Sequence, residues 1–252
     1  MEINFSAIDR VSPLGRVLRL PLKLLPDGAV VPILQGPLRG KKWIVGSSNH
    51  GCWLGSYEHS KCKVFQAIVR ERSVVYDIGA NVGYYTLLAS QLGGSSGQVF
   101  AFEPVPRNCA LLRQHLKLNK VSNASLIEAA VSSADGEARF DTGPNPSMGH
   151  LAADGALRVR SVTLDTLVFG QATPPPQVIK IDVEGAEAEV LTGGSETLLR
   201  HRPLILLATH GETVHRECRR ILDRLGFLVE SLDGRPIDRC DELIARPSRV
   251  MS

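Results

Sequence analysis

The stretch that decides the fold is VVYDIGANVGYYTLLA, residues 74–89. An apolar run ends on an acid, Asp77, and two glycines four residues apart, Gly79 and Gly83, precede a segment with helical spacing. A strand, a glycine turn and a helix in this order usually hold a phosphate in α/β proteins. A carboxylate at the strand end would repel a phosphate, so this turn indicates a different ligand.

The chain after residue 73 alternates apolar strands with helices. We expect strands over 73–79, 97–104, 124–131, 174–185 and 203–211, and a closing antiparallel pair over 227–234 and 241–248. Helices are expected over 84–92, 106–119, 186–201 (interrupted at Gly193 and Gly194) and 213–226. The alternation is typical of a doubly wound, mostly parallel α/β sheet, in which ligands bind beyond the carboxyl ends of the strands.

Two regions depart from the alternating pattern. Residues 1–66 are rich in Pro, Gly and turn signals, so we expect an N-terminal β/loop extension there and a main domain over 67–252. Residues 132–165 predict two further strands around the loop TGPNPSMGH, residues 142–150, which could act as a mobile lid. Residues 1–66 and 140–160 are the parts of the sequence that give the least information about function.

Composition and charge exclude several classes of protein. The net charge of +3 and the pI near 8.6 come with scattered arginines, so we expect no nucleic-acid partner. Five cysteines without a CxxC pair argue against a disulfide framework or a zinc site. The sequence shows no signal-peptide pattern and no apolar run near the ~18 residues of a membrane span, so we expect a cytoplasmic protein. The oligomeric state stays open, with a homodimer as one alternative.

The glycine turn does not match the common nucleotide motifs. Its pattern is Asp77-x-Gly79-x-Asn81-x-Gly83, whereas the dinucleotide fingerprint is G-x-G-x-x-G, and the Gly-Lys-Ser/Thr of a P-loop is missing. Asn81 is of a type that tolerates a left-handed backbone. Asp77 suits a cationic ligand, and Glu103, at the end of the next strand, can accept both hydroxyls of a ribose. A ligand with a cationic amino-acid end and a ribose is S-adenosylmethionine.

Either acid alone has a structural alternative, since Asp77 could cap the turn and Glu103 could pair with Arg107. The combined pattern is similar to the FkbM family of S-adenosylmethionine-dependent methyltransferases, in stretches over residues 74–89, 97–108, 115–119, 162–167 and 178–194. The resemblance implies a class I, Rossmann-like fold with a seven-stranded sheet, and methyl transfer to a hydroxyl of a small molecule, sugar or glycan. Many members carry a Glu where this chain has Ala208, which would pass the role of that Glu to a neighbour such as His210.

The resemblance also implies which residues line the cofactor. They are Asp77, Gly79, Asn81 and Gly83 at the methionine end, Glu103 and Pro104 at the ribose, Glu128 and Ala129 at the adenine, Asp182 beside the transferring methyl, and Tyr57 as a cover. Glu128 could equally face solvent, and packing alone would explain Tyr57.

Two residues are candidates for handling the proton of the acceptor. The motif KIDVEG ends a buried strand, and alternation puts Lys180, Asp182 and Glu184 on one side of the backbone. We predict that Asp182 orients the acceptor hydroxyl or accepts its proton, because a protonated alcohol is a poor nucleophile. His210, at the end of the next strand, is the second candidate, since histidine titrates near neutral pH. The structural alternatives are an internal pair of Lys180 with Glu184 or Glu187, and a hydrogen-bonded surface histidine.

Other ligands and functions compete with this interpretation. Asp182, Glu184 and His210 could hold Mg²⁺, but their spacing is not a recognised metal motif, so no metal ligand is predicted. A nicotinamide-dependent oxidoreductase is disfavoured by Asp77 and by the missing fingerprint. A non-catalytic S-adenosylmethionine-binding protein gains weight from Ala208. RNA methylation is disfavoured because the sequence lacks an aromatic and basic patch.

Overall fold

The computed structural model describes residues 25–141, 150–151 and 155–248, and its centre is a seven-stranded sheet of order β12-β13-β11-β10-β3-β4-β5. β13 runs antiparallel to both neighbours, and the other neighbouring pairs are parallel. The strands are β3 (Val74–Ile78), β4 (Gln98–Phe102), β5 (Ala124–Ile127), β10 (Val178–Ile181), β11 (Leu204–Ala208), β12 (Phe227–Ser231) and β13 (Glu242–Pro247). This confirms the predicted doubly wound, mostly parallel sheet and its closing antiparallel pair.

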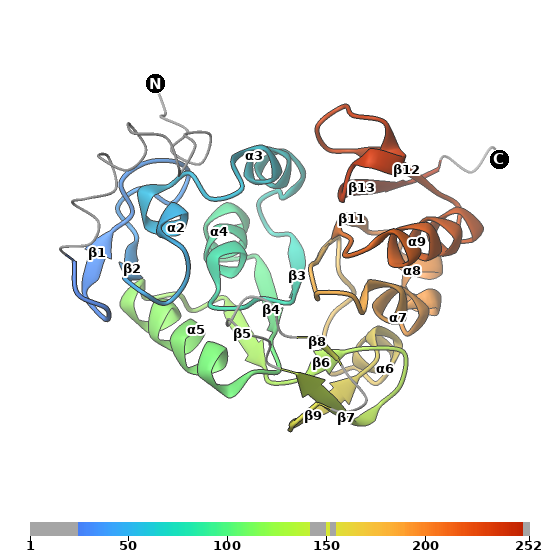
Figure 1. Cartoon of the computed structure of the whole chain (residues 1–252), viewed down its shortest axis with the longest axis horizontal. Helices are drawn as coiled ribbons and strands as arrows, with labels where there is room; N and C mark the ends of the chain where they lie inside the picture. The colour runs from blue at the N-terminus through green and yellow to red at the C-terminus, as the bar shows by residue number, and fades with distance from the viewer. Residues whose placement is uncertain (1–24, 142–149, 152–154, 249–252) are drawn as a thin grey trace.

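Alternation along β3 decides which side chains enter each face of the sheet. Tyr76 and Ile78 belong to the apolar core on one face, whereas Val75 and Asp77 point to the opposite face. The helices are α4 (Tyr84–Gly93), α5 (Pro106–Leu118), α6 (Leu164–Phe169), α7 (Glu187–Thr192), α8 (Ser195–His201) and α9 (Glu212–Arg224). Figure 1 shows α4 and α5 on one side of the sheet and α7, α8 and α9 on the other. The predicted helix break between residues 192 and 195 is confirmed.

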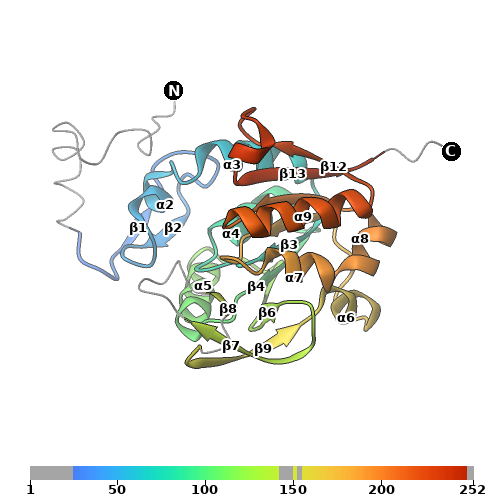
Figure 2. The ribbon, with the colours of Figure 1, turned by 45° about the vertical axis from the view of Figure 1, so that its right-hand side comes forward.

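The described part of the N-terminal region is more helical than expected. β1 (Val30–Pro32) and β2 (Lys42–Ile44) form an antiparallel pair, but α2 (His50–Leu54) and α3 (His59–Ile68) follow. The β/loop expectation was therefore wrong for these helices, because the Pro and Gly content upstream hid the helical spacing of the buried Cys62, Phe65 and Ile68. α3 continues past residue 66, and the domain division at that residue stays a prediction. Figure 2 shows α3 beside β13.

A second, smaller sheet lies beside the main one. It contains the two further strands predicted within residues 132–165, but their separation from the main sheet was not predicted. Its order is β6-β9-β7-β8, formed by β6 (Ala130–Val131), β7 (Gly136–Asp141), β8 (His150–Leu151) and β9 (Leu157–Val162). The strand predicted over 124–131 is split, because β5 ends at Ile127 and β6 pairs with β9. The predicted lid falls largely on residues 142–149, which lie outside the described residues. In the part of the chain that the structure describes, no helix is both long and apolar enough to cross a membrane.

A buried histidine ties the N-terminal strands to the main domain. His115, from α5, stacks on Trp43 of β2 with ring centroids 4.0 Å apart. Its Nε2 accepts a hydrogen bond from the Ile44 amide at 3.1 Å, so the proton must reside on Nδ1, which donates to the Val82 carbonyl at 2.8 Å. One neutral imidazole therefore links β2, α5 and the turn before α4.

We expect His115→Gln to destabilise the protein by about 1–3 kcal/mol at neutral pH, because the stacking and one of the two hydrogen bonds are weakened. Burial lowers the pKa of His115 in the folded state. The unfolded chain therefore binds a proton first, and the stability that this histidine contributes is present above about pH 6.5 and is lost as the pH falls below it. Urea unfolding at pH 7.5 and 5.5 should show a smaller loss on acidification in the variant than in the wild type.

The matched control is His201→Gln, at an exposed position in α8. This variant should keep the pH dependence of the wild type. An equal loss of stability on acidification in wild type and His115→Gln would contradict the assigned protonation state.

Candidate active site

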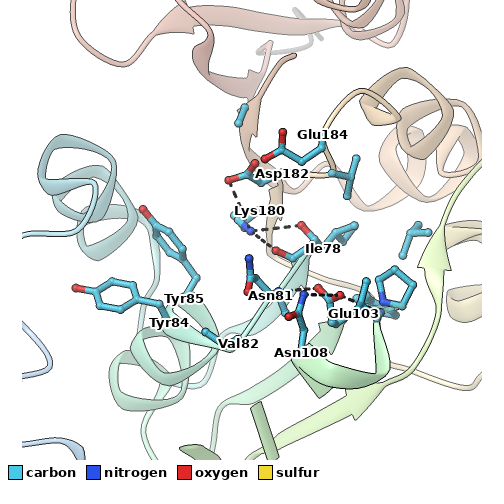
Figure 3. A pocket seen from close by; sticks show the side chains of 18 of the residues that line it. Ile78, Asn81, Val82, Tyr84, Tyr85, Glu103, Asn108, Lys180, Asp182 and Glu184 are labelled. Carbon is cyan, nitrogen blue, oxygen red and sulfur yellow. Dashed lines mark hydrogen bonds and ion pairs between the residues drawn. The ribbon is translucent and has the colours of Figure 1, made fainter. Parts of the chain in front are cut away.

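A cavity opens at the carboxyl ends of the parallel strands. The predicted site residues that line it are Tyr57, Gly79, Asn81, Glu103, Pro104, Ala129, Asp182 and His210. Figure 3 shows Asp182 and Glu184 on one side, and Glu103 and Asn108 on the other. Asp77, Gly83 and Glu128 do not line the cavity. Strands far apart in sequence therefore bring most of the predicted residues to one site, as expected for this type of sheet.

The glycine turn has a shape that larger residues cannot adopt. Gly79 has φ +75°, and a Cβ there would lie 1.8 Å from the carbonyl oxygen of Asp182. Gly83, with φ +93°, begins α4 against Leu112. Asn81 has φ 49°, which confirms the predicted left-handed backbone. The turn therefore packs tightly under the end of β10 and presents backbone to the cavity.

Asp77 stabilises the glycine turn from the side that faces away from the cavity. Its Oδ2 accepts a hydrogen bond from Thr86 Oγ1 at 2.6 Å, and its Oδ1 lies 3.3 Å from Lys180 Nζ without hydrogen-bond geometry. Lys180 donates to the Gly79 carbonyl at 2.8 Å. Asp77 is fully buried, so the predicted contact with a cofactor gains no support from the geometry. The acid before the glycines is paired with an internal lysine. Lys180 therefore pairs with Asp77 and not with Glu184 or Glu187, the partners that the structural alternative had named.

Glu103 ends β4 and is held by three donors. Oε2 accepts from the Asn81 amide at 2.8 Å, and Oε1 accepts from the Val105 amide at 3.0 Å and from Asn108 Nδ2 at 3.2 Å. Burial raises the pKa of Glu103, and these hydrogen bonds act against the rise. Arg107, the alternative partner, donates to Asn108 instead. The glycine turn and the carboxylate therefore form one rigid unit.

Glu128 and Ala129, which follow β5, lie in different environments. Ala129 is buried and lines the cavity. The Glu128 side chain is about half exposed and pairs with Arg113, which favours the solvent-facing alternative for this residue. The structure gives no support to the predicted contact of Glu128 with adenine, since Glu128 does not line the cavity.

Asp182 stands at the other end of the cavity, between two lysines. Lys61 Nζ, from α3, is 3.0 Å from Asp182 Oδ2, and Lys180 Nζ is 3.9 Å away. Burial favours the neutral acid, but the two positive charges outweigh it and hold the pKa of Asp182 well below its usual range. Asp182 is therefore ionised, which makes it a weak base and a good hydrogen-bond acceptor for a hydroxyl.

The sequence did not predict a role for Lys61 or for one of its carboxylate partners, Glu242. Lys61 also lies 3.0 Å from Glu242 Oε1 and 3.3 Å from Glu58 Oε2. Glu242 begins β13 and is paired in register with Ala208 of β11. Many family members carry a Glu at the position of Ala208, and in this chain a carboxylate is supplied by the neighbouring strand instead. No spacing in the sequence indicates this, because the two strands meet only in the folded sheet.

His210 forms a dyad with a buried glutamate. Its Nδ1 lies 2.8 Å from Glu187 Oε1, which also accepts from the Gly185 amide at 3.0 Å. Its Nε2 lies 3.5 Å from Glu184 Oε2 and 3.8 Å from Asp182 Oδ1. The hydrogen bond to Glu187, opposed by burial and aided by the charges of Glu184 and Glu187, raises the pKa of His210 to about 9. His210 is therefore positioned to exchange a proton inside the cavity.

The same groups resemble a metal site only in part. Ligand atoms of Asp182, Glu184 and His210 lie within 4.8 Å of one another. Mg²⁺ prefers an all-oxygen set, however, and Lys61 already neutralises Asp182. The arrangement therefore favours proton handling over cation binding.

We expect the His210 ring to titrate at about pH 9 in NMR spectra of the free protein. Glu187→Gln should lower that pKa, because it removes the carboxylate that stabilises the charged imidazole. Glu189→Gln, an exposed position on the same helix, is the matched control and should leave the titration unchanged. A wild-type midpoint near the ordinary value of about 6.5 would contradict the dyad.

Comparisons with known proteins agree with this geometry. Residues 77–229 match the family model described as Methyltransferase FkbM domain. Hexuronic acid methyltransferase AglP from Haloferax volcanii is 30% identical over 130 residues, 51% of this chain and 52% of AglP. The 2-O-methyltransferase NoeI from Sinorhizobium fredii is 30% identical over 169 residues, 57% of this chain and 68% of NoeI. The chain thus spans about half the length of AglP.

The fold is also similar to that of a SAM-dependent O-methyltransferase from Thermotoga maritima. The TM-score is 0.51 at 14% identity, over 92% of this chain and 82% of that chain. This likeness confirms the class I methyltransferase fold. Because the family model covers more than half of the sequence, the chain belongs to the FkbM methyltransferase family.

Proposed function

We propose that this protein is an S-adenosylmethionine-dependent O-methyltransferase that acts on a hydroxyl of a sugar or glycan. The observation that carries the proposal is that one cavity joins Glu103 to Asp182 and His210. Glu103 stands beside the glycine turn, where a ribose would be held. Asp182 and His210 stand at the other end, where an acceptor hydroxyl would meet the methyl group.

The wall of the cavity fits a sulfonium cofactor better than a nucleotide phosphate. The carboxylates of Glu103 and Asp182 line it, and Lys180 is already engaged by Asp77 and by the Gly79 carbonyl. S-adenosylmethionine, when bound, supplies an electrophilic methyl group on a positively charged sulfur. The residues that would hold it are Glu103 and Pro104 at the ribose, Gly79 and Asn81 at the methionine portion, and Ala129 at the adenine.

The acceptor hydroxyl needs orientation and a route for its proton. Asp182, kept ionised by Lys61, accepts a hydrogen bond from the hydroxyl and directs its oxygen toward the methyl group. His210, in its neutral form, takes the proton on Nε2 while Glu187 holds Nδ1. Because the pKa of His210 is about 9, the neutral fraction grows as the pH rises toward that value.

The N-terminal segment would cover the acceptor. Tyr57 lines the cavity and meets Tyr84 edge-on, with ring centroids 5.0 Å apart. Glu58, also on the wall, accepts a hydrogen bond from Tyr85 at 2.9 Å. Aromatic faces next to hydrogen-bonding groups suit a hydroxylated ring.

The names of the relatives support a sugar acceptor. AglP is named for a hexuronic acid and NoeI for 2-O-methylation. A nicotinamide-dependent oxidoreductase loses its support, because the chain belongs to a methyltransferase family. A non-catalytic role is weakened by Glu242, which lines the cavity beside Ala208. Nothing in the site supports a requirement for Mg²⁺, and the cytoplasmic location and the homodimer stay predictions from the sequence.

We expect Glu103→Gln to weaken binding of S-adenosylmethionine and S-adenosylhomocysteine by about 10- to 100-fold, since hydrogen bonds to a charged acceptor contribute about 1.5–3 kcal/mol. Calorimetric titration measures both affinities. Glu230→Gln, on the exposed edge strand β12, is the control and should bind like the wild type. Unchanged affinity in Glu103→Gln, or no binding by the wild type, would refute the cofactor assignment.

We expect His210→Ala to lower turnover by about 10²- to 10⁴-fold, the range for loss of a general base, while affinity for S-adenosylhomocysteine changes little. Asp182→Asn should also lower turnover, through loss of orientation. Methyl transfer from labelled S-adenosylmethionine to a panel of sugars gives the rates, with His201→Ala as the control. Full activity in both site variants would show that the proton leaves by another route.

A further inference from the structure

The acceptor end of the cavity is rich in carboxylates. Of the described residues that line the cavity, none is an arginine and one is a lysine, Lys180. Five have carboxylate side chains: Glu58, Glu103, Asp182, Glu184 and Glu242. Four of these five, all except Glu103, gather around Lys61 and His210, at the end assigned to the acceptor.

The positive charges near these acids are already used. Lys61 has 3% of its side chain exposed, pairs with three carboxylates and is not part of the cavity wall. Lys180 is equally buried and donates to the Gly79 carbonyl under the glycine turn. The protonated His210 is shared among Glu187, Glu184 and Asp182. Among the described wall residues, the carboxylates therefore outnumber the cations, and the cation that is open to a ligand, His210, already lies beside Glu184 and Asp182.

Among the carboxylates that line the cavity, Glu242 has an oxygen that lacks a donor. Glu242 Oε1 is paired with Lys61, but Oε2 is buried without a hydrogen-bond partner. Burial raises the pKa of Glu242, with Lys61 acting against the rise, and burial also raises the pKa of Glu184. A neighbouring anion would make such oxygens less stable still, whereas a hydroxyl or ammonium donor would satisfy them.

We propose that the acceptor end selects against negative charge, so that the acceptor is a neutral hydroxylated sugar ring or one with an ammonium group, and not a uronate. The inference rests on the proposed function and adds a charge class to its substrate. A carboxylate on the ring would face at least three anions of the described wall, and His210, its one exposed cation, is already flanked by Glu184 and Asp182, whereas ring hydroxyls would donate to Glu58, Glu184 or Glu242. By this criterion the chain differs from AglP, which is named for a hexuronic acid.

The test compares three acceptors of the same ring shape: methyl glucoside, the corresponding methyl glucosaminide and the corresponding methyl glucuronide. With saturating S-adenosylmethionine, we expect kcat/KM for the glucuronide to be at least ~10-fold below that for the glucoside, a difference of ~1.4 kcal/mol. Ligand-observed NMR on the protein loaded with S-adenosylhomocysteine should give the same order of affinities. Raising the salt concentration should narrow the difference, because the repulsion is electrostatic.

Two variants test whether the carboxylates of the acceptor end cause the preference for the glucoside over the glucuronide. Glu184→Gln and Glu242→Gln each remove one negative charge and should each reduce the glucoside-to-glucuronide ratio by about threefold or more. Glu230→Gln, far from the cavity on β12, should leave the ratio unchanged.

The outcomes separate the inference from the proposed function. Equal or better use of the glucuronide would overturn the inference and leave sugar methylation standing. If S-adenosylhomocysteine binds but no sugar is methylated, the affinities measured by NMR decide whether the acceptor end selects by charge. Equal binding of the three sugars, or no binding of any of them, would contradict that selection. If the protein binds neither cofactor form, the proposed function fails and the inference falls with it.

Discussion

The rest of the site depends on one buried ammonium group, that of Lys180. It lies beneath the glycine turn, donates to the Gly79 carbonyl and faces the carboxylate of Asp77, which is in register with it on the neighbouring strand. Burying a lysine is costly unless its donors are satisfied, and this one is satisfied only if the turn keeps its shape. The turn in turn supplies the amide that holds Glu103. The pair of Lys180 and Asp77 therefore sets the geometry from the strand end to the proposed ribose site.

A second lysine organises the other half of the cavity. Lys61 comes from α3, yet its partners belong to the ends of β10 and β13. Its charge keeps Asp182 ionised, while the buried Glu187 keeps His210 protonated. The ionised Asp182 and the His210 ring then lie side by side, and in the proposed mechanism Asp182 orients the hydroxyl while the neutral fraction of His210 accepts its proton.

Much of the fold and part of the site could be predicted from the sequence. The alternation of strands and helices is a local pattern, and the binding of ligands at strand ends follows from the topology of the sheet. Together they were enough to place Asn81, Glu103, Asp182 and His210 around one cavity. The direction of Asp77 could not be predicted, since it depends on which face of the sheet its partner occupies. Lys61 and Glu242 were missed for a related reason: 181 residues separate them, and only tertiary packing makes them neighbours.

The ion pairs of Lys61 have a consequence for the order in which the protein folds. Their partners lie at positions 58, 182 and 242, so the cluster closes only after nearly the whole chain is available. Contacts of such long sequence separation form late, because their loop-closure entropy is offset only when the intervening elements are in place. During synthesis the central sheet from β3 to β11 can assemble before β13 emerges. The cavity is then among the last parts of the molecule to be completed, and a chain arrested before Glu242 would lack both β13 and the carboxylate that this strand brings to the cavity wall.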